Sequence, residues 1–406
     1  MATRIIIIGA GQAGAQGAVS LRQAGFAGEI VMFGDEPAAP YQRPPLSKAY
    51  LKGELEEVRL LLRPCAFYEQ QRISLRLSER VRLIDRGAQI VITERDVETH
   101  YDKLLIATGA PPRRLNSPGA ELENIFYLRT MADSDALRSI LNCDGRVVIV
   151  GAGYIGLEVA AVARQAGRNV TLLEMADRVL ARVAGKAVSE FYQKLHRDAG
   201  VDLRLGSALD EFVSENGKVT GVKLTTGEII DCESVLIGIG AVPDETLAAE
   251  AGLEVGNGIV VDEYARTSDE QIFAAGDCTN FPSLRYGRRM RLESVPNAIE
   301  QAKTAGANMA GKSIVYDALP WFWSDQYDVK LQTAGLMEGH DEFVVRGDPE
   351  TKRFAVWYLK DGKPLAVDAI NDPASFAMGK RLIERSAAVD ATAIADVSVD
   401  LRTLAR

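Results

Sequence analysis

The same short pattern occurs twice in this chain, as residues 4–14, RIIIIGAGQAG, and as residues 146–156, RVVIVGAGYIG. Each copy opens with a β-branched run, which is typical of a strand buried on both faces, and passes through G-x-G-x-x-G into good helix formers. Free N–H groups at the start of such a helix bind the pyrophosphate of a dinucleotide. The sequence therefore predicts two dinucleotide sites in an α/β protein with two Rossmann-like domains.

The glycines of each copy have separate tasks. In the first copy Gly9 allows the tight turn, Gly11 lets phosphate approach the backbone, and Gly14 lets the helix pack closely on the strand. In the second copy the same tasks fall to Gly151, Gly153 and Gly156.

An acidic residue stands near the end of the second strand of each copy, Asp35 in the first and Glu174 in the second. Such a carboxylate accepts hydrogen bonds from ribose hydroxyls and repels a 2′-phosphate. Either acid alone is equally well a solvated surface carboxylate, but paired with matching units they favour nucleotide binding. Glu174 favours NADH over NADPH, a preference that Arg178 and Arg182 nearby would soften.

Composition narrows the class of protein. A chain of 406 residues with 47% hydrophobic and 25% charged residues fits two or three ordinary globular domains. The net charge of −9 argues against nucleic-acid binding. No apolar run approaches a membrane span. Because the first expected strand begins at Arg4, we expect no secretory signal and a cytoplasmic protein.

The cysteines and histidines show no metal-site spacing. The four cysteines lie far apart, without C-x-x-C, which favours free thiols in a reducing compartment; they are Cys65, Cys143, Cys232 and Cys278. The three histidines, His100, His196 and His340, are isolated, and no metal is expected.

Strand patterns and prolines indicate the domain boundaries. The apolar strand 103–109 ends on Thr-Gly before two prolines, and 235–240 is the last buried strand of the second module. From about Leu319 the aromatic residues concentrate and strands reappear. We expect a discontinuous first domain, 1–112 and 242–318, a second domain, 113–241, and a C-terminal domain, 319–406. The prolines of 40–48 stop regular structure, and we expect a helix from Ser47.

Blocks along nearly the whole chain resemble the flavoprotein family with two dinucleotide-binding domains, and most closely the putidaredoxin-reductase-like ferredoxin reductases. Besides the two glycine motifs, the blocks are Pro44–Lys48, Ala107–Gly109, Tyr127–Thr130, Ala275–Cys278, Glu293–Asn297 and Trp321–Gln326. P-P-L-S-K and W-F-W-S-D-Q are specific to this subgroup. The resemblance implies a glutathione-reductase-like fold with an α+β C-terminal interface domain, non-covalent FAD in the first module and NADH in the second.

The resemblance also implies the cofactor-binding residues. Carried over by position, FAD contacts Ala13, Asp35, Lys48, Val81, Arg129, Asp277 and Val295. The wider set for both cofactors adds Gly9, Gly11, Gly14, Glu36, Arg43, Ala107, Thr108, Gly109, Gly151, Gly153, Tyr154, Ile155, Gly156, Glu174, Gly240, Gly276, Glu293, Ser294 and Trp323. Asp277 suits this task, because a carboxylate after a buried strand can accept bonds from ribityl hydroxyls; alternatively it caps a helix or turn.

Lys48 and Glu158 are the expected catalytic residues. The resemblance places them on opposite sides of the nicotinamide–flavin junction, as an ion pair that orients the reacting rings. The alternatives are an exposed helical glutamate and a surface loop on which Arg43 and Lys48 are solvated.

The function implied is that of an NADH:ferredoxin reductase, which passes electrons from NADH through FAD singly to a [2Fe–2S] ferredoxin serving a haem-thiolate monooxygenase. The cofactors carry this chemistry, and no side-chain acid or base is required. Alternatives are the reductase of an aromatic-ring dioxygenase, a rubredoxin reductase, or a non-enzymatic NADH-sensing flavoprotein. A disulfide reductase is disfavoured, because residues 43–48 hold no cysteine.

We expect the ferredoxin to dock transiently near Lys303 and Trp323. The resemblance implies this place, because Lys303 matches a ferredoxin-docking position of the family and Trp323 an aromatic residue between flavin and docking surface. Arginines cluster shortly before Lys303, and small acidic ferredoxins would be steered by a local basic patch; they are Arg285, Arg288, Arg289 and Arg291. The alternatives are a solvated hairpin for the arginines and core packing for Trp323. The protein is expected to be a monomer or weak dimer.

Overall fold

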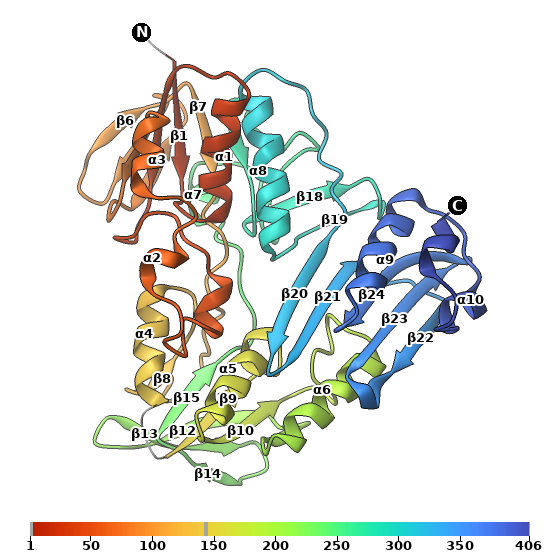
Figure 1. Ribbon diagram of the computed structural model, residues 1–406. Helices are drawn as coiled ribbons and strands as arrows, with labels where there is room; N and C mark the ends of the chain where they lie inside the picture. The colour runs from red at the N-terminus through yellow and green to blue at the C-terminus, as the bar shows by residue number, and fades with distance from the viewer. Residues whose placement is uncertain (1–2, 142–144, 406) are drawn as a thin grey trace. The chain divides into compact units, whose positions relative to one another are not determined.

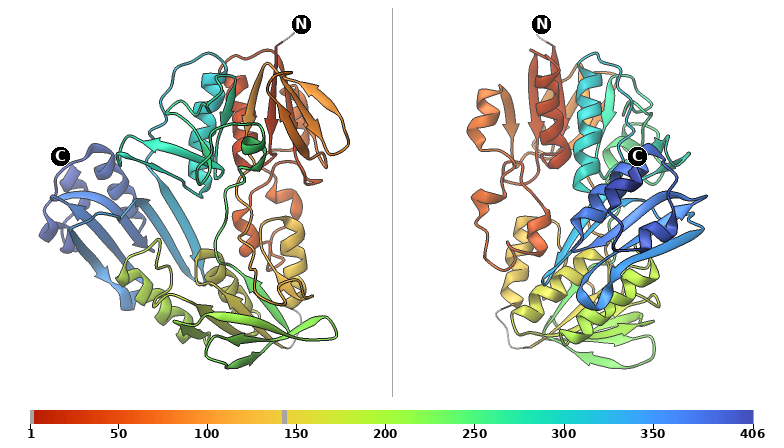
Figure 2. Two further views of the ribbon diagram at one scale, coloured as in Figure 1. Left: turned by 180° about the vertical axis from the view of Figure 1, so that it is seen from behind. Right: turned by 45° about the vertical axis from the view of Figure 1, so that its right-hand side comes forward.

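The structure is a computed structural model and describes residues 3–141 and 145–405. The chain divides into two compact units, each made of three segments. Unit 1 is Met1–Gln42, Glu57–Pro111 and Ala241–Pro320, and unit 2 is Arg43–Glu56, Pro112–Gly240 and Trp321–Arg406. Figure 1 labels the elements, and Figure 2 shows them from two further sides.

Unit 1 is built on a parallel sheet of five strands in the order β17-β7-β1-β2-β3. Its strands are β1 (Arg4–Ile8), β2 (Glu29–Phe33), β3 (Ile73–Arg76), β7 (Lys103–Ile106) and β17 (Ile272–Ala274). Isoleucines 5 to 7 are fully buried, as expected for a central strand. Helix α1 (Gln12–Gln23) joins β1 to β2 and packs along α8 (Val295–Met309). Figures 1 and 2 both show these two helices side by side.

Two small sheets complete unit 1. One is antiparallel and contains β4 (Val81–Asp85), β5 (Ile90–Thr93) and β6 (Glu98–His100). The other contains β16 (Ile259–Val260), β18 (Thr279–Ser283) and β19 (Arg288–Met290). The remaining helices are short: α2 (Glu57–Leu60), α3 (Cys65–Gln70) and α7 (Thr246–Glu250).

Unit 2 contains a second parallel sheet, in the order β11-β10-β9-β15-β8. Its strands are β8 (Ile125–Phe126), β9 (Arg146–Val150), β10 (Asn169–Glu174), β11 (Asp202–Leu205) and β15 (Ser234–Ile237). The helices are α4 (Met131–Ile140), α5 (Tyr154–Gln165) and α6 (Lys186–Asp198). A small antiparallel sheet holds β12 (Leu209–Glu215), β13 (Lys218–Leu224) and β14 (Ile229–Asp231).

The C-terminal part of unit 2 is an antiparallel sheet in the order β20-β21-β24-β23-β22. Its strands are β20 (Trp321–Gln326), β21 (Val329–Gly335), β22 (Glu342–Asp348), β23 (Arg353–Lys360) and β24 (Lys363–Ile370). Helix α9 (Pro373–Arg385) packs on this sheet, and β20 lies against α5. The short elements are η2 (Pro349–Thr351), α10 (Ala391–Ala395) and η3 (Leu401–Ala405).

The α/β class with two Rossmann-like sheets and an α+β C-terminal part is confirmed, whereas the helix expected from Ser47 is wrong. A 3-10 turn, η1 (Pro44–Ser47), ends where that helix was to begin. Two prolines suit the first turn of a helix, where an N–H is not needed, but Lys48 leaves the helical region with φ −134 and ψ −115.

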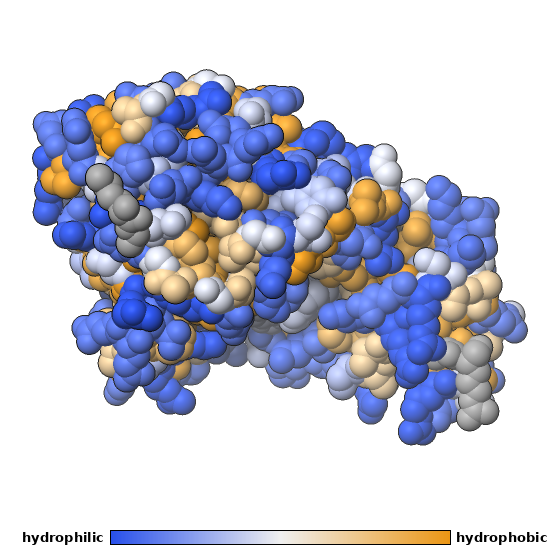
Figure 3. Space-filling model, turned by 90° about the horizontal axis from the view of Figure 1, so that it is seen from above, coloured by the Kyte–Doolittle hydropathy of each residue, from blue (hydrophilic) through white to orange (hydrophobic). Residues whose placement is uncertain are grey.

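Polar and charged side chains dominate the one face that Figure 3 shows. Hydrophobic residues form small groups on this face. Large exposed hydrophobic side chains, such as Val58, Met175 and Val397, come from distant parts of the chain. No helix within residues 3–141 and 145–405 combines the length and apolar character needed to cross a bilayer.

Candidate functional site

The first glycine turn is shaped to admit a phosphate. A Cβ on Gly9, whose φ is 108°, would lie 2.2 Å from the carbonyl oxygen of Ala107, and one on Gly14 would lie 1.9 Å from that of Gly9. Both positions therefore demand glycine. Around Gly11, in contrast, a Cβ would meet nothing within 4 Å. The turn packs tightly on its inner side and is open at Gly11, where a pyrophosphate would approach the backbone.

The second turn repeats this geometry. A Cβ on Gly151, with φ 100°, would lie 2.5 Å from the oxygen of Gly238, and one on Gly156 would lie 2.0 Å from that of Gly151. Gly153 again faces open space. Neither α1 nor α5 has an acidic residue in its first turn or a side-chain cap, so both N-terminal dipoles remain available to an anion. Both sites fit the pyrophosphate of a dinucleotide.

Glu174 is held beside the second turn by two backbone N–H groups. Its carboxylate accepts from Ala152 at 2.7 Å and from Ala176 at 2.9 Å. Arg178, in contrast, donates to the carbonyl oxygen of Ala184 in its own loop and to the hydroxyl of Ser189 in α6. The Glu174 carboxylate is thus fixed at the end of β10. Arg178, one of the two arginines that could weaken the repulsion between this carboxylate and a 2′-phosphate, already binds other groups of the protein.

The acids of the first module are less constrained. Asp35 follows β2 and is exposed, while its half-buried neighbour Glu36 accepts a hydrogen bond from the Tyr41 hydroxyl at 2.5 Å. Val81 begins β4 and is 3% exposed. Of the two acids, Asp35 therefore has the carboxylate that faces solvent.

Lys48 and Glu158 lie together in unit 2. The Lys48 Nζ is 2.6 Å from Oε2 of Glu158, a carboxylate that is only 3% exposed. Ser47 donates to the same oxygen at 2.5 Å, and Ser324 donates to Oε1 at 2.6 Å. Glu158 is therefore no ordinary exposed helical glutamate. Charge and hydrogen bonds compensate its burial, as a buried carboxylate requires.

Arg43 belongs to the same unit and is anchored rather than solvated. Its Nη1 donates to the carbonyl oxygen of Arg129 at 2.6 Å. The N–H of Arg129 in turn donates to Asp133, which also takes part in the capping box of α4. This network ties the P-P-L-S-K turn to the start of α4.

Tyr154 and Ile155 begin α5, directly after the second glycine turn. The Tyr154 ring lies 4.4 Å from that of Phe322 in β20, and burial raises the pKa of its hydroxyl. Ile155 is 44% exposed. Gly240 follows β15 with φ 105°, and the guanidinium of Arg182 lies against it.

In unit 1, Gly276, which follows β17, lies close to Ala13 of α1. A Cβ on Gly276, whose φ is 91°, would lie 3.0 Å from that of Ala13. The N–H of Gly276 donates to Oε1 of Gln301, which also accepts from the Thr279 hydroxyl. Sequence reasoning missed Gln301. It is fully buried on α8, and its Nε2 has no partner among the described residues, yet no motif contains it.

The other expected residues of unit 1 occupy turns and caps. Thr108 donates its hydroxyl to Asp244 at 2.7 Å, between Ala107, which is 7% exposed, and Gly109, with φ 78°. Ser294 caps α8 by accepting from Asn297. Three expected residues remain. Glu293 pairs with Arg291, and Val295 is the first residue of α8. Asp277 is half-buried and follows β17.

Two of the described cysteines, Cys232 and Cys278, are buried thiols. Burial raises the pKa of Cys232 to about 12 and that of Cys278 to about 11, which keeps both as thiols. Cys65 is exposed, and Cys143 lies outside the described residues. Within residues 3–141 and 145–405 no group of three His, Cys, Asp or Glu side chains could hold a metal.

The arginines before Lys303 are largely engaged. Arg289 donates to the carbonyls of Val261 and Asn280, Arg291 pairs with Glu293, and Arg285 lies 4.0 Å from Asp317. Lys303 itself is exposed and pairs with Glu300 at 2.7 Å. In unit 2, the half-buried Trp323 ring lies 5.6 Å from that of Trp321.

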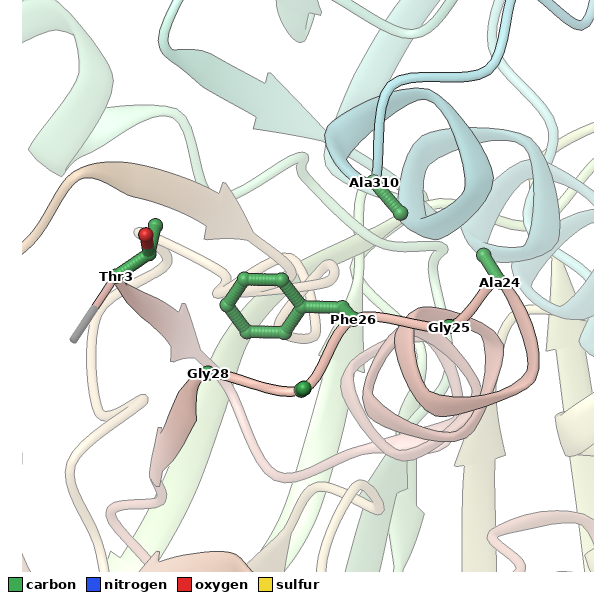
Figure 4. A pocket seen from close by; sticks show the side chains of 7 residues that line it. Thr3, Ala24, Gly25, Phe26, Gly28 and Ala310 are labelled. Atoms are coloured by element: carbon green, nitrogen blue, oxygen red, sulfur yellow. The ribbon is translucent and has the colours of Figure 1, made fainter.

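A surface pocket lies at the other end of α1 from the glycine turn. It is lined by Thr3, Ala24, Gly25, Phe26, Ala27, Gly28 and Ala310, and the Phe26 ring points toward Thr3 (Figure 4). None of the expected cofactor residues lines it, and its lining has no charged side chain. We assign no function to this pocket.

Both parts of the chain match known families. Residues 3–302 match the family described as pyridine nucleotide-disulphide oxidoreductase, and residues 321–405 match the family described as reductase C-terminal. The chain therefore belongs to the pyridine nucleotide-disulphide oxidoreductase family, whose cofactors are FAD and NAD(H).

The similarity to three ferredoxin reductases extends over nearly the whole of each chain. The 5,5′-dehydrodivanillate O-demethylase ferredoxin reductase subunit of Sphingobium sp. is 45% identical, over 98% of this chain and 97% of its own. Putidaredoxin reductase of Pseudomonas putida is 44% identical, over 98% and 96%. The crystal structure of the ferredoxin reductase for the CYP199A2 system from Rhodopseudomonas palustris superposes with a TM-score of 0.97 at 41% identity, covering 99% of this chain and 100% of that one. The resemblance to ferredoxin reductases is confirmed.

Proposed function

We propose that this protein is an NADH:ferredoxin reductase that passes electrons from NADH through non-covalent FAD, one at a time, to a [2Fe–2S] ferredoxin. The observation that carries this proposal is the pair of glycine turns, each closed on its inner side and open toward a phosphate, in a chain similar over its whole length to ferredoxin reductases. The raised pKa values of Cys232 and Cys278 disfavour a disulfide reductase.

FAD, when bound, supplies the conversion of a two-electron donor into a one-electron donor. The chain's own residues bind and orient. The N-termini of α1 and α5 hold the two pyrophosphates, and Asp35 and Glu174 accept the ribose hydroxyls. The Lys48–Glu158 pair orients the reacting rings, and its burial keeps the pair rigid.

We further propose the domain roles and setting expected from the sequence. Residues 1–112 and 242–318 bind FAD, 113–241 bind NADH, and 319–406 form the interface domain. The remaining cofactor contacts are those that the resemblance implies. The protein works in the cytoplasm as a monomer or weak dimer.

The final acceptor we propose is a haem-thiolate monooxygenase. Two relatives support this choice by name, putidaredoxin reductase and the reductase of the CYP199A2 system. The Sphingobium relative, named for an O-demethylase, keeps other oxygenases as the second candidate.

The test is NADH-driven reduction of cytochrome c with and without added [2Fe–2S] ferredoxin. A reductase requires the ferredoxin for speed, so its addition should raise the rate strongly. A rate that stays slow with ferredoxin would instead support an NADH-sensing flavoprotein. Replacing the ferredoxin with rubredoxin tests the rubredoxin alternative in the same assay.

A further inference from the structure

A line of buried polar side chains continues from Glu158 away from Lys48. Ser324 donates to Glu158 at 2.6 Å, and Gln326 Nε2 lies 3.2 Å from the Ser324 hydroxyl. His196 Nε2 lies 2.8 Å from Gln326 Oε1, and the Tyr327 hydroxyl lies 3.4 Å from His196 Nδ1. Ser324, Gln326 and His196 are all at most 1% exposed. The line joins α5, β20 and α6 within unit 2.

The carboxylate fixes the direction of every bond in this line. An ionised carboxylate only accepts, so Ser324 must donate to Glu158 and can accept only from the amide nitrogen of Gln326. The amide oxygen then faces His196, so the histidine carries its proton on Nε2, and its Nδ1 accepts from Tyr327. Every donor in the line points toward Glu158.

The line orients, and it does not conduct protons. The amide of Gln326 donates through its nitrogen and accepts through its oxygen, and it has no ionisable proton at neutral pH. What the line can transmit is geometry. Each group is held by its next neighbour, and the last bond fixes Oε1 of Glu158 while Ser47 and Lys48 hold Oε2.

The outer end of the line is held by a tight turn. Tyr327 and Asp328 form the two-residue connection between β20 and β21, since Gln326 pairs with Val329. Tyr327 has a φ of 55°, which is rare for a bulky residue, and its ring lies 5.2 Å from that of His196. The turn thus places the aromatic hydroxyl at the histidine.

We propose that Ser324, Gln326 and His196 are positioning residues for the reaction with NADH, because they hold the Glu158 carboxylate in the orientation in which it pairs with Lys48. This inference rests on the proposed function, in which that pair orients the reacting rings. It assigns a role to the Ser and Gln of W-F-W-S-D-Q and to a histidine outside every motif.

The kinetic test is stopped-flow bleaching of bound FAD by NADH in the holoprotein. Ser324→Ala should slow bleaching about tenfold, the factor that a hydrogen bond to a charged group commonly represents, with little change in the NADH concentration for half-maximal rate. Ser324→Thr, which keeps the hydroxyl, should restore the rate. Ser375→Ala is the matched control. That serine is equally buried in the same part of the chain but bonds to Asp372, so its loss should leave bleaching unchanged.

A double-mutant cycle shows whether Ser324 acts through Glu158. In a Glu158→Gln background, Ser324→Ala should slow bleaching no further. Independent, multiplicative losses would overturn the proposal, as would an unchanged rate in Ser324→Ala alone.

The second readout requires no turnover. In ¹⁵N-histidine-labelled holoprotein, His196 should show the Nε2–H tautomer at neutral pH, with its signals assigned by His100→Gln and His340→Gln. Gln326→Leu should shift the Nε2–H resonance, because its acceptor is lost. An Nδ1–H tautomer in the wild type would overturn the line itself. If the wild type is not bleached by NADH at all, the proposed function fails, and the tautomer still decides whether the line exists.

Discussion

At the level of one residue, Glu174 shows how the fold fixes a charge at a motif position. Both oxygens of its carboxylate accept backbone N–H groups, from Ala152 and Ala176, so the charge is fixed beside the second glycine turn. A fixed charge repels more effectively than one that can rotate away, because moving it would break these bonds.

We expect wild-type protein to use NADH in strong preference to NADPH and Glu174→Ala to narrow that preference by at least about tenfold, since a close like-charge contact costs several kcal/mol. The measurement is kcat/KM for both nucleotides in both proteins. Equal use of NADPH by the wild type would contradict the assignment.

Lys48→Met and Glu158→Gln should each slow the bleaching of FAD by NADH, by about a hundredfold if orientation is their main contribution. Flavin content serves as the control, because the rates are compared only between proteins that hold equal amounts of FAD. The melting temperature Tm should fall in Lys48→Met, which leaves a buried carboxylate without its cation. Bleaching at wild-type rates would reduce both residues to a structural ion pair.

At the level of elements, each strand–turn–helix unit uses its glycines in two different ways. Gly14 is needed so that α1 can pass close to the turn, whereas Gly11 faces open space. Substitution at the two positions therefore has different physical consequences.

Gly14→Ala should prevent proper folding of unit 1, because its Cβ would lie 1.9 Å from a backbone oxygen that has no room to move. Gly11→Ala should retain the circular dichroism spectrum but bind FAD at least about tenfold more weakly, because its methyl group occupies the approach of the phosphate. The measurements are circular dichroism and the Kd for FAD of the apoprotein. Equal FAD affinity in Gly11→Ala and wild type would contradict the phosphate site.

The contact between α6 and β20 should make stability depend on pH. Burial lowers the pKa of His196 from 6.5 to about 4, so the unfolded chain takes up the proton more readily than the folded one. The contribution of the neutral histidine is thus fully present above pH 6.5 and is lost as the pH falls toward 4, by up to about 3 kcal/mol.

We expect the gap in denaturation midpoint between wild type and His196→Gln to be constant above pH 7 and to shrink between pH 6.5 and pH 4. Urea unfolding of the holoproteins across this range measures it. A gap that does not change with pH would show that His196 is not buried as a neutral ring.

At the level of the whole molecule, charge bears on the choice of partner. A chain with net charge −9 repels an acidic ferredoxin at long range, so docking needs a local cationic site. Lys303 is exposed and pairs with Glu300, and its exchange for glutamate would set two like charges side by side.

Lys303→Glu should lower the rate of ferredoxin reduction about tenfold at low ionic strength, and the deficit should shrink as salt is added. NADH-to-ferricyanide activity should be unchanged. Lys312→Glu is the matched control, because it makes the same change at another exposed lysine of unit 1. Loss of both activities, or of neither, would place docking elsewhere.

A structural feature could be predicted from the sequence when its residues lie close together in the chain. The two nucleotide turns could be predicted because strand, glycines and helix follow one another directly, within residues 4–23 and 146–165. The Lys48–Glu158 pair came only from family resemblance, since 110 residues separate its members. His196 looked isolated because its partner Gln326 lies 130 residues away. The arginines before Lys303 stay a predicted basic patch, because an arginine that donates hydrogen bonds keeps its charge. What their spacing in the sequence could not show is that Arg289 donates to two backbone carbonyls and that Arg291 pairs with Glu293.

The location of Ser324 matters for any attempt to recombine such reductases. The segment matching the reductase C-terminal family starts at Trp321, an inviting crossover point for a chimera with a new choice of ferredoxin. Yet β20 carries the hydroxyl that binds Glu158 and the amide that binds His196. A C-terminal segment from another reductase that lacks this serine and glutamine would bring a new docking surface, but it would leave the buried Glu158 carboxylate without one of its hydrogen-bond donors. The crossover is better placed after Gln326, so that the recipient keeps its own strand.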